Sequence, residues 1–167
     1  MSRTVEADQI RNAFLDALRA EGASVESMAD RAANASNETV RNLLLALGRA
    51  GREVYLVPGV GFINVHVRSE GRGWWGILKS VKKDLDFLAN ELGMKCYFVL
   101  LIGRDDKYIA DGYIVTDFAR SPFLKPPSVD ATKYTVNERQ HLNPSKRFLS
   151  IGKVAKTLMA FRRAAAT

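Results

Sequence analysis

The chain has 167 residues, of which 47% are hydrophobic and 26% are charged, and this composition excludes a wholly disordered protein. Its longest apolar run, Cys96 to Ile102, is far shorter than the roughly 18 residues of a membrane span. The N-terminus lacks the apolar core of a signal peptide, and the single cysteine cannot form an internal disulfide. We therefore expect a soluble, cytoplasmic protein with no membrane partner.

The charge is distributed unevenly along the chain. Residues 1–70 contain 8 basic and 9 acidic side chains, and residues 71–167 contain 17 and 9, so net charges of −1 and +8 add to the overall +7. Every basic residue of the first part is arginine, whereas the second part mixes lysine and arginine. This break predicts two units, residues 1–66 and 67–167. A basic surface attracts polyanions such as nucleic acid, although a solvated surface without a partner is the alternative.

Three short helices and a hairpin are predicted in the first unit. Apolar residues four apart predict a helix over residues 8–20. Ser24 is placed to cap a second helix that ends at residue 32, and Ser36 is placed to cap a third. Residues 54–65 then alternate strand, Pro-Gly turn and strand, which is typical of a β-hairpin.

This order of helix, helix-turn-helix and hairpin is the layout of a winged helix. Residues 8–66 resemble the DNA-binding domains of GntR-like bacterial regulators in three strings: Ser24-Val-Glu-Ser-Met-Ala-Asp-Arg31, Ser36-Asn-Glu-Thr-Val-Arg-Asn-Leu-Leu44 and Pro58-Gly-Val-Gly-Phe62. The turn over residues 32–36 is one residue longer than is usual there and lacks glycine. The resemblance implies that the third helix enters the major groove of double-stranded DNA. A protein-interaction module is the other use that the nearly neutral charge allows.

The candidate DNA contacts of this unit lie on the polar side of the third helix and at the hairpin turn. Ser36 and Thr39 could donate to phosphate beside the helix N-terminus, and Arg41 could contact guanine or the backbone. A glycine at position 59 permits close approach to the minor groove. The full set is Ser36, Asn37, Thr39, Arg41, Asn42 and Gly59.

The second unit is predicted to be a mixed α/β domain with a small curved sheet, so we assign the whole chain to the α+β class. The glycine-rich stretch at residues 71–76 is expected to break the preceding strand. The elements that follow are an amphipathic helix from residue 77 to Gly93, strands at 97–102, 108–116 and 133–138, a proline-containing loop at 120–132, and a last helix capped by Ser150.

This order resembles the pseudobarrel DNA-binding domains of the plant B-three family and of restriction-endonuclease effector domains. The strings that carry the resemblance are Trp74-Trp75-Gly-Ile77, Tyr97-Phe-Val-Leu-Leu101, Gly112-Tyr-Ile114, Lys133-Tyr-Thr-Val-Asn-Glu138 and Arg147-Phe-Leu-Ser150. It implies a pseudobarrel that grips DNA through two arms, Arg68 to Lys79 and Lys125 to His141. Lysine and arginine would hold phosphates, and asparagine and glutamine could read adenine. The contacts implied are Arg68, Ser69, Arg72, Lys79, Lys133, Asn137, Arg139 and Gln140.

Few residues of the chain have the types and the spacing that a catalytic or metal site requires. His66 and His141 have no metal-ligand spacing, and no glycine-rich segment has the spacing of a phosphate loop. One further set of residues invites comparison with magnesium-dependent nucleases: Asp84, Asp86, Asp105, Asp106 and Lys107. Solvated turn charges explain them more simply. We therefore expect no catalytic residues, no metal and no cofactor.

The preferred interpretation is a sequence-specific double-stranded DNA-binding protein without its own chemistry, able to serve as the recognition part of a restriction or other DNA-transaction system. Two alternatives stay open. One is a transcriptional regulator whose residues 67–167 sense a ligand or dimerise, which makes a homodimer one of the partners considered. The other is a small magnesium-dependent nuclease that uses the carboxylates named above.

Overall fold

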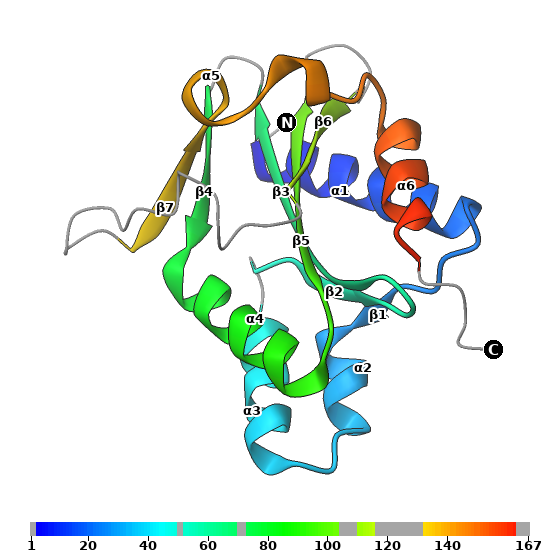
Figure 1. Cartoon of the computed structure of the whole chain (residues 1–167), viewed down its shortest axis with the longest axis vertical. Helices are drawn as coiled ribbons and strands as arrows, with labels where there is room; N and C mark the ends of the chain where they lie inside the picture. The colour runs from blue at the N-terminus through cyan, green and yellow to red at the C-terminus, as the bar shows by residue number, and fades with distance from the viewer. Residues whose placement is uncertain (1–2, 50–51, 70–72, 104–109, 116–131, 163–167) are drawn as a thin grey trace.

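The computed structural model describes residues 3–49, 52–69, 73–103, 110–115 and 132–162 (Figure 1). Within these residues the chain forms a mixed five-stranded sheet, a separate two-stranded sheet, and helices on both faces of the larger sheet. The prediction of a mixed α+β protein is confirmed. No helix in this part of the chain combines the length and the apolar character that crossing a membrane requires.

The five-stranded sheet has the order β1-β2-β3-β5-β6. Its strands are β1 (Glu26–Ser27), β2 (Val54–Val57), β3 (Gly61–Ser69), β5 (Cys96–Gly103) and β6 (Ala110–Val115). The predicted hairpin is present, because β2 and β3 are antiparallel with Val57 opposite Gly61. At the centre, β3 and β5 run parallel through eight residue pairs, from Phe62 opposite Cys96 to Ser69 opposite Gly103.

The smaller sheet consists of β4 (Trp74–Leu78) and β7 (Lys133–Asn137), which pair antiparallel. It lies against β3, and the indole Nε1 of Trp75 donates a 2.9 Å hydrogen bond to the carbonyl of Leu101 in β5. Side chains alternate along β4, so that Trp75 and Ile77 are buried while Trp74 stays partly exposed. The indole therefore fastens the small sheet to the large one.

Two helices cover one face of the large sheet. They are α1 (Arg3–Ala20) and α6 (Ile151–Ala160), which pack against each other. Phe14 and Leu18 of α1 and Leu158 of α6 are completely buried there, against odd-numbered strand residues such as Ile63 and Val99. The burial follows from period-2 alternation in the strands and from apolar residues four apart in the helices.

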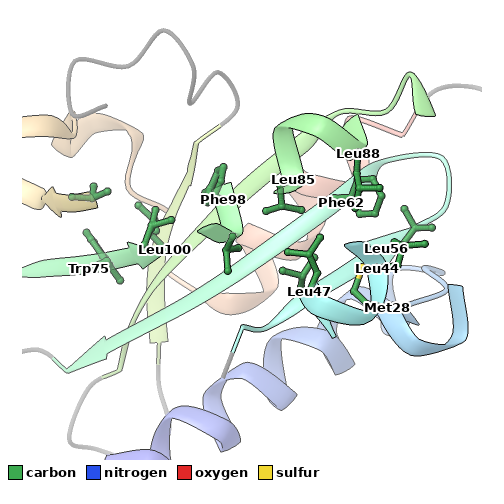
Figure 2. Close-up of a cluster of buried hydrophobic side chains, with 14 of the residues drawn as sticks. Met28, Leu44, Leu47, Leu56, Phe62, Trp75, Leu85, Leu88, Phe98 and Leu100 are labelled. Carbon is green, nitrogen blue, oxygen red and sulfur yellow. The ribbon is translucent and has the colours of Figure 1, made fainter. Parts of the chain in front are cut away.

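The opposite face is covered by α2 (Met28–Ala33), α3 (Glu38–Leu47), α4 (Lys79–Leu92) and the small sheet. Figure 2 shows this core, in which side chains from three helices and Trp75 meet even-numbered strand residues. The labelled members are Met28, Leu44, Leu47, Leu56, Phe62, Trp75, Leu85, Leu88, Phe98 and Leu100. A short helix α5 (Glu138–His141) and a 3₁₀ turn (Pro144–Lys146) connect β7 to the last helix.

Several predicted element boundaries are wrong by a few residues. The second helix begins at Met28 with Ser27 as its N-cap, because residues 26–27 pair with β2 as a strand. Asn37, one residue after the predicted cap, accepts the capping hydrogen bond of α3. Residues 74–78, expected as a break and a helix start, form β4. The predicted ends at Gly93 and Ser150 are confirmed, since Gly93 is a left-handed C-cap and Ser150 caps α6.

The N-terminal helices do not share one core. α2 and α3 pack together on one face of the sheet, whereas α1 lies on the other face beside α6 (Figure 1). The winged-helix arrangement expected for residues 1–66 is therefore not confirmed. The boundary expected after residue 66 falls inside β3, and strands from both sides of it form one sheet. The division into two independent units stays a prediction.

The prediction of a pseudobarrel is wrong, as the pairing of the strands shows. Among the described residues, β4 and β7 form their own sheet, and no strand closes the five-stranded sheet on itself. The physical reason is the parallel pairing of β3 with β5, which places helices on both faces and leaves an open sheet between them.

Candidate nucleic-acid interface

The polar side of α3 is accessible. Thr39, Arg41 and Asn42 are exposed, while Leu44 and Leu47 on the opposite side are buried against the sheet. Glu38 and Leu45 share the accessible side, and Leu45 is 50% exposed although it is apolar. Figure 1 shows α2 and α3 at one extremity of the molecule. A partner could therefore reach the first two turns of α3 directly.

Asn37, and not Ser36 as the sequence suggested, is the N-cap of α3. The backbone N–H of Val40 donates to Oδ1 of Asn37 over 3.1 Å, so this side-chain oxygen is used inside the chain. The amide nitrogen of Asn37 and the second lone pair of Oδ1 remain for a partner. Ser36 precedes the cap and is exposed in the turn between α2 and α3.

Arg41 fixes the turn as well as facing outward. Its guanidinium Nη2 donates a 2.6 Å hydrogen bond to the carbonyl of Ala35 in that turn. A guanidinium has five N–H donors, and this bond uses one of them. Arg41 therefore positions the N-terminus of α3 and still presents donors beside it.

The turn of the hairpin is occupied by another part of the chain. Gly59 has a φ of +84°, and a Cβ atom at this position would lie 3.2 Å from Cγ of Arg162. The glycine was predicted to let DNA approach closely, but the side chain of Arg162, which follows α6, lies over it. The group that a partner would meet at this turn is the arginine.

The small sheet gathers three of the C-terminal candidates. Lys133 and Asn137 lie on the same face of β7 as partly exposed Trp74 of β4, because residues two apart on a strand share a face. Val136 between them is buried. Lys79 follows at the start of α4, and its backbone N–H donates to the carbonyl of Thr132 over 2.9 Å.

The remaining candidates lie apart from the small sheet or outside the description. Ser69 ends β3 and is exposed, and Arg139 is exposed on α5. Arg72 and the side chain of Gln140 lie outside the described residues. Figure 1 places α3 and β7 well apart, so the structure brings the candidates together in two groups on different elements.

Arg68, one of the predicted DNA contacts, is an interior residue. Its side chain is only 4% exposed and forms an ion pair with Glu138 of α5. The guanidinium carbon lies 4.5 Å from the centroid of the Trp75 ring, and Nη1 donates to the carbonyl of Ser69 over 3.0 Å. Burial lowers the pKa of Arg68, and the negative charge of Glu138 opposes this effect. Arg68 is therefore engaged inside the protein.

Glu138 is the centre of a polar cluster that joins four parts of the chain. Its Oε2 accepts a 2.6 Å hydrogen bond from the hydroxyl of Tyr113 in β6 and pairs with Arg147 at 3.4 Å. The Tyr113 ring in turn packs edge-on against Trp75, with centroids 6.1 Å apart. Burial and the hydrogen bond to Glu138 raise the pKa of Tyr113 to about 12, so the phenol keeps its proton. The cluster holds α5 and the small sheet in place.

A second network of hydrogen bonds inside the fold contains His66. Nδ2 of Asn64 donates to the carbonyls of Arg52 and Glu53, at 2.8 and 3.2 Å, which leaves Oδ1 to accept from Nε2 of His66 at 2.5 Å. His66 therefore carries its proton on Nε2 in the neutral form. Burial, and then the positive charges of Arg11 and Lys133, lower the pKa of His66 to about 4.

This histidine predicts a dependence of stability on pH. Its folded pKa of about 4 lies below its ordinary value of 6.5, so the unfolded chain binds the proton more readily between these values. Stability is therefore complete above pH 6.5 and falls as the pH decreases towards 4. Urea titrations across this range should show a shallower loss for His66→Gln than for the unmodified chain. The His141→Gln variant leaves a single imidazole, so that NMR titration assigns the pKa directly; a value near 6.5 would contradict the expectation.

The described residues contain no group of three or more His, Cys, Asp or Glu side chains placed to hold a metal ion. Asp84 and Asp86 lie on α4, where Asp86 pairs with Lys82. Asp105, Asp106 and Lys107 of the nuclease alternative lie outside the described residues. That alternative stays untested.

Two residues that shape this surface were not found from the sequence. Glu138 was read only as the end of a strand, although it binds an arginine 70 positions earlier. Arg162 lies over the hairpin turn, which nothing in the sequence around it indicates. No pattern around Glu138 in the sequence marks it as the partner of a buried arginine.

Comparison with known proteins gives no family to which the chain can be assigned. No protein-family model matches the sequence, and no curated protein matches it.

Proposed function

We propose that this protein binds double-stranded DNA in a sequence-specific manner, with the first two turns of α3 lying in the major groove. The proposal includes service as the recognition part of a restriction or other DNA-transaction system. In its finer form, α2, α3 and the β2–β3 hairpin act as the helix-turn-helix and wing of a winged helix. An α-helix has the diameter that the major groove admits, and its N-terminal residues then meet base edges.

The observation that carries the proposal is the exposed polar side of α3. Thr39, Arg41 and Asn42 follow one another at the N-terminal end, and no described part of the chain covers them. Asparagine can bind adenine through two hydrogen bonds, and arginine can bind guanine in the same way. Thr39 is placed to donate to a phosphate, assisted by the partial positive charge of the helix N-terminus.

The decisive variant is Asn42→Ala. The side chain of Asn42 is exposed and forms no hydrogen bond or ion pair with the described side chains, whereas Arg41 also holds the turn. On a duplex selected from a random pool, loss of a base contact should weaken binding by about 1–3 kcal/mol. On random duplexes the change should be small, because phosphate contacts carry non-specific binding. Fluorescence anisotropy of the full chain measures both.

Thr135→Ala is the matched control. Thr135 is exposed on β7, which Figure 1 places well apart from α3. It should bind both kinds of duplex normally. If the Asn42→Ala and Thr39→Ala variants bind the selected duplex as tightly as the unmodified chain does, the assignment of α3 to the major groove is overturned.

A further inference from the structure

α3 alone has too little positive charge to supply the affinity of a DNA-binding protein. Residues 1–70 carry a net charge of −1, and Glu38 is exposed in the first turn of α3. In protein–DNA complexes, contacts to bases give specificity, while neutralisation of phosphates by lysine and arginine gives most of the non-specific affinity. If the proposed function holds, another surface must supply the phosphate contacts.

The C-terminal part of the chain has the required charge. Residues 139–167 contain seven lysines and arginines and no acidic residue. Lys153 and Lys156 are exposed on one side of α6, three residues apart and so on the same helix face, and Arg162 is exposed just after the helix. Among the described side chains, no carboxylate forms an ion pair with any of these three cations.

Arg162 connects this charge to the hairpin. A Cβ atom on Gly59 would lie 3.2 Å from Cγ and 3.4 Å from Nε of Arg162, so the arginine stem rests on the glycine backbone. The same hairpin continues through β2 to β1, which leads directly into α2 and then α3. Figure 1 shows α6, the hairpin and α2 following one another along one side of the molecule.

From this arrangement we infer that Lys153, Lys156 and Arg162 form a phosphate-binding surface for the backbone of the duplex whose bases α3 reads. This inference rests on the proposed function. The hairpin turn then contacts DNA through the guanidinium of Arg162, because Gly59 has no side chain and that of Arg162 lies over it. The three cations hold phosphates without regard to sequence, so they set the strength of binding and its dependence on salt.

The test is the salt dependence of binding by the full chain to a 20-base-pair duplex. Each phosphate contact contributes about 0.9 to the slope of log affinity against log salt concentration. The variant Lys153→Gln/Lys156→Gln/Arg162→Gln should therefore lower that slope by about 2.7 and weaken binding to selected and random duplexes alike.

A second variant protects the test against loss of folding. Lys153→Gln/Lys156→Gln leaves the contact of Arg162 with Gly59 intact and should lower the slope by about 1.8. An unchanged slope in both variants would overturn the inference. Binding to vesicles of phosphatidylserine and phosphatidylcholine that exceeds DNA binding, and that these variants abolish, would overturn it in favour of a membrane partner.

The two proposals fail in different ways. If Asn42→Ala loses the preference for the selected duplex while the double and triple variants of the α6 surface keep the normal salt slope, the reading helix stands and the α6 surface is removed. If those two variants lower the salt slope while Asn42→Ala keeps its full preference for the selected duplex, the α6 surface stands and α3 is removed from the proposed function.

Discussion

Glu138→Ala is expected to destabilise the fold by about 3–5 kcal/mol, because it leaves the buried guanidinium of Arg68 without its carboxylate. It also removes the acceptor of the Tyr113 hydroxyl, a 2.6 Å hydrogen bond. Taking one partner from a buried ion pair costs more than the pair contributes, since the remaining charge stays away from water. Urea unfolding followed by circular dichroism measures the change in the free energy of unfolding.

Two further variants identify the cause of this loss. Glu91→Ala removes an exposed carboxylate from α4 and should change stability by less than about 0.5 kcal/mol. Adding Arg68→Met to Glu138→Ala removes the unpaired charge and should recover part of the lost stability. A double variant as unstable as the sum of its single variants would show that the ion pair is not the cause.

Gly61→Ala has the second largest expected effect. Gly61 begins β3 with a φ of +141°, and a Cβ atom there would overlap the carbonyl oxygen of Lys95, which accepts a 2.9 Å hydrogen bond from the N–H of Phe62. Because the obstacle is backbone, no side chain can move to relieve it. The strained conformation alone costs about 1–3 kcal/mol, and the overlap adds to this. Thermal unfolding should show a clearly lower transition temperature.

Gly22→Ala separates the two contributions. Gly22 also has a positive φ, +90°, but a Cβ atom at this position has nothing within 4 Å. Its substitution should therefore cost only the backbone strain, about 1 kcal/mol. Equal losses at positions 22 and 61 would mean that the segment before β5, which contains Lys95, moves away freely, and that the parallel pair is less rigid than described.

Features that depend on near neighbours could be predicted from the sequence. The β2–β3 hairpin follows from its Pro-Gly turn, and the end of α4 follows from Gly93. Caps were found to within a few residues only. Both residue types in each pair, Ser24 and Ser27 or Ser36 and Asn37, can cap a helix. At the first helix start the choice follows from the pairing of residues 26–27 with β2, which the local pattern does not reveal.

Features that join distant segments could not be predicted in this way. Nothing in the local pattern of α1 says which face of the sheet it covers, and its apolar stripe suits either. The pairing of Arg68 with Glu138 and the contact of Arg162 with Gly59 each join residues about 70 or more positions apart. The polar side of α3 was identified correctly because helical periodicity alone determines it, whereas the α6 surface needed the tertiary fold.

The parallel neighbour of β3 has a consequence for synthesis on the ribosome. β3 is complete at Ser69, but its partner strand ends only at Gly103. A nascent chain exposes the hydrogen-bonding edge of β3 until 34 more residues have left the exit tunnel, because these residues include the whole crossover helix α4. The N-terminal segment thus emerges first yet folds late, and an exposed strand edge during that interval is the point at which association with a chaperone or with a second nascent chain would begin.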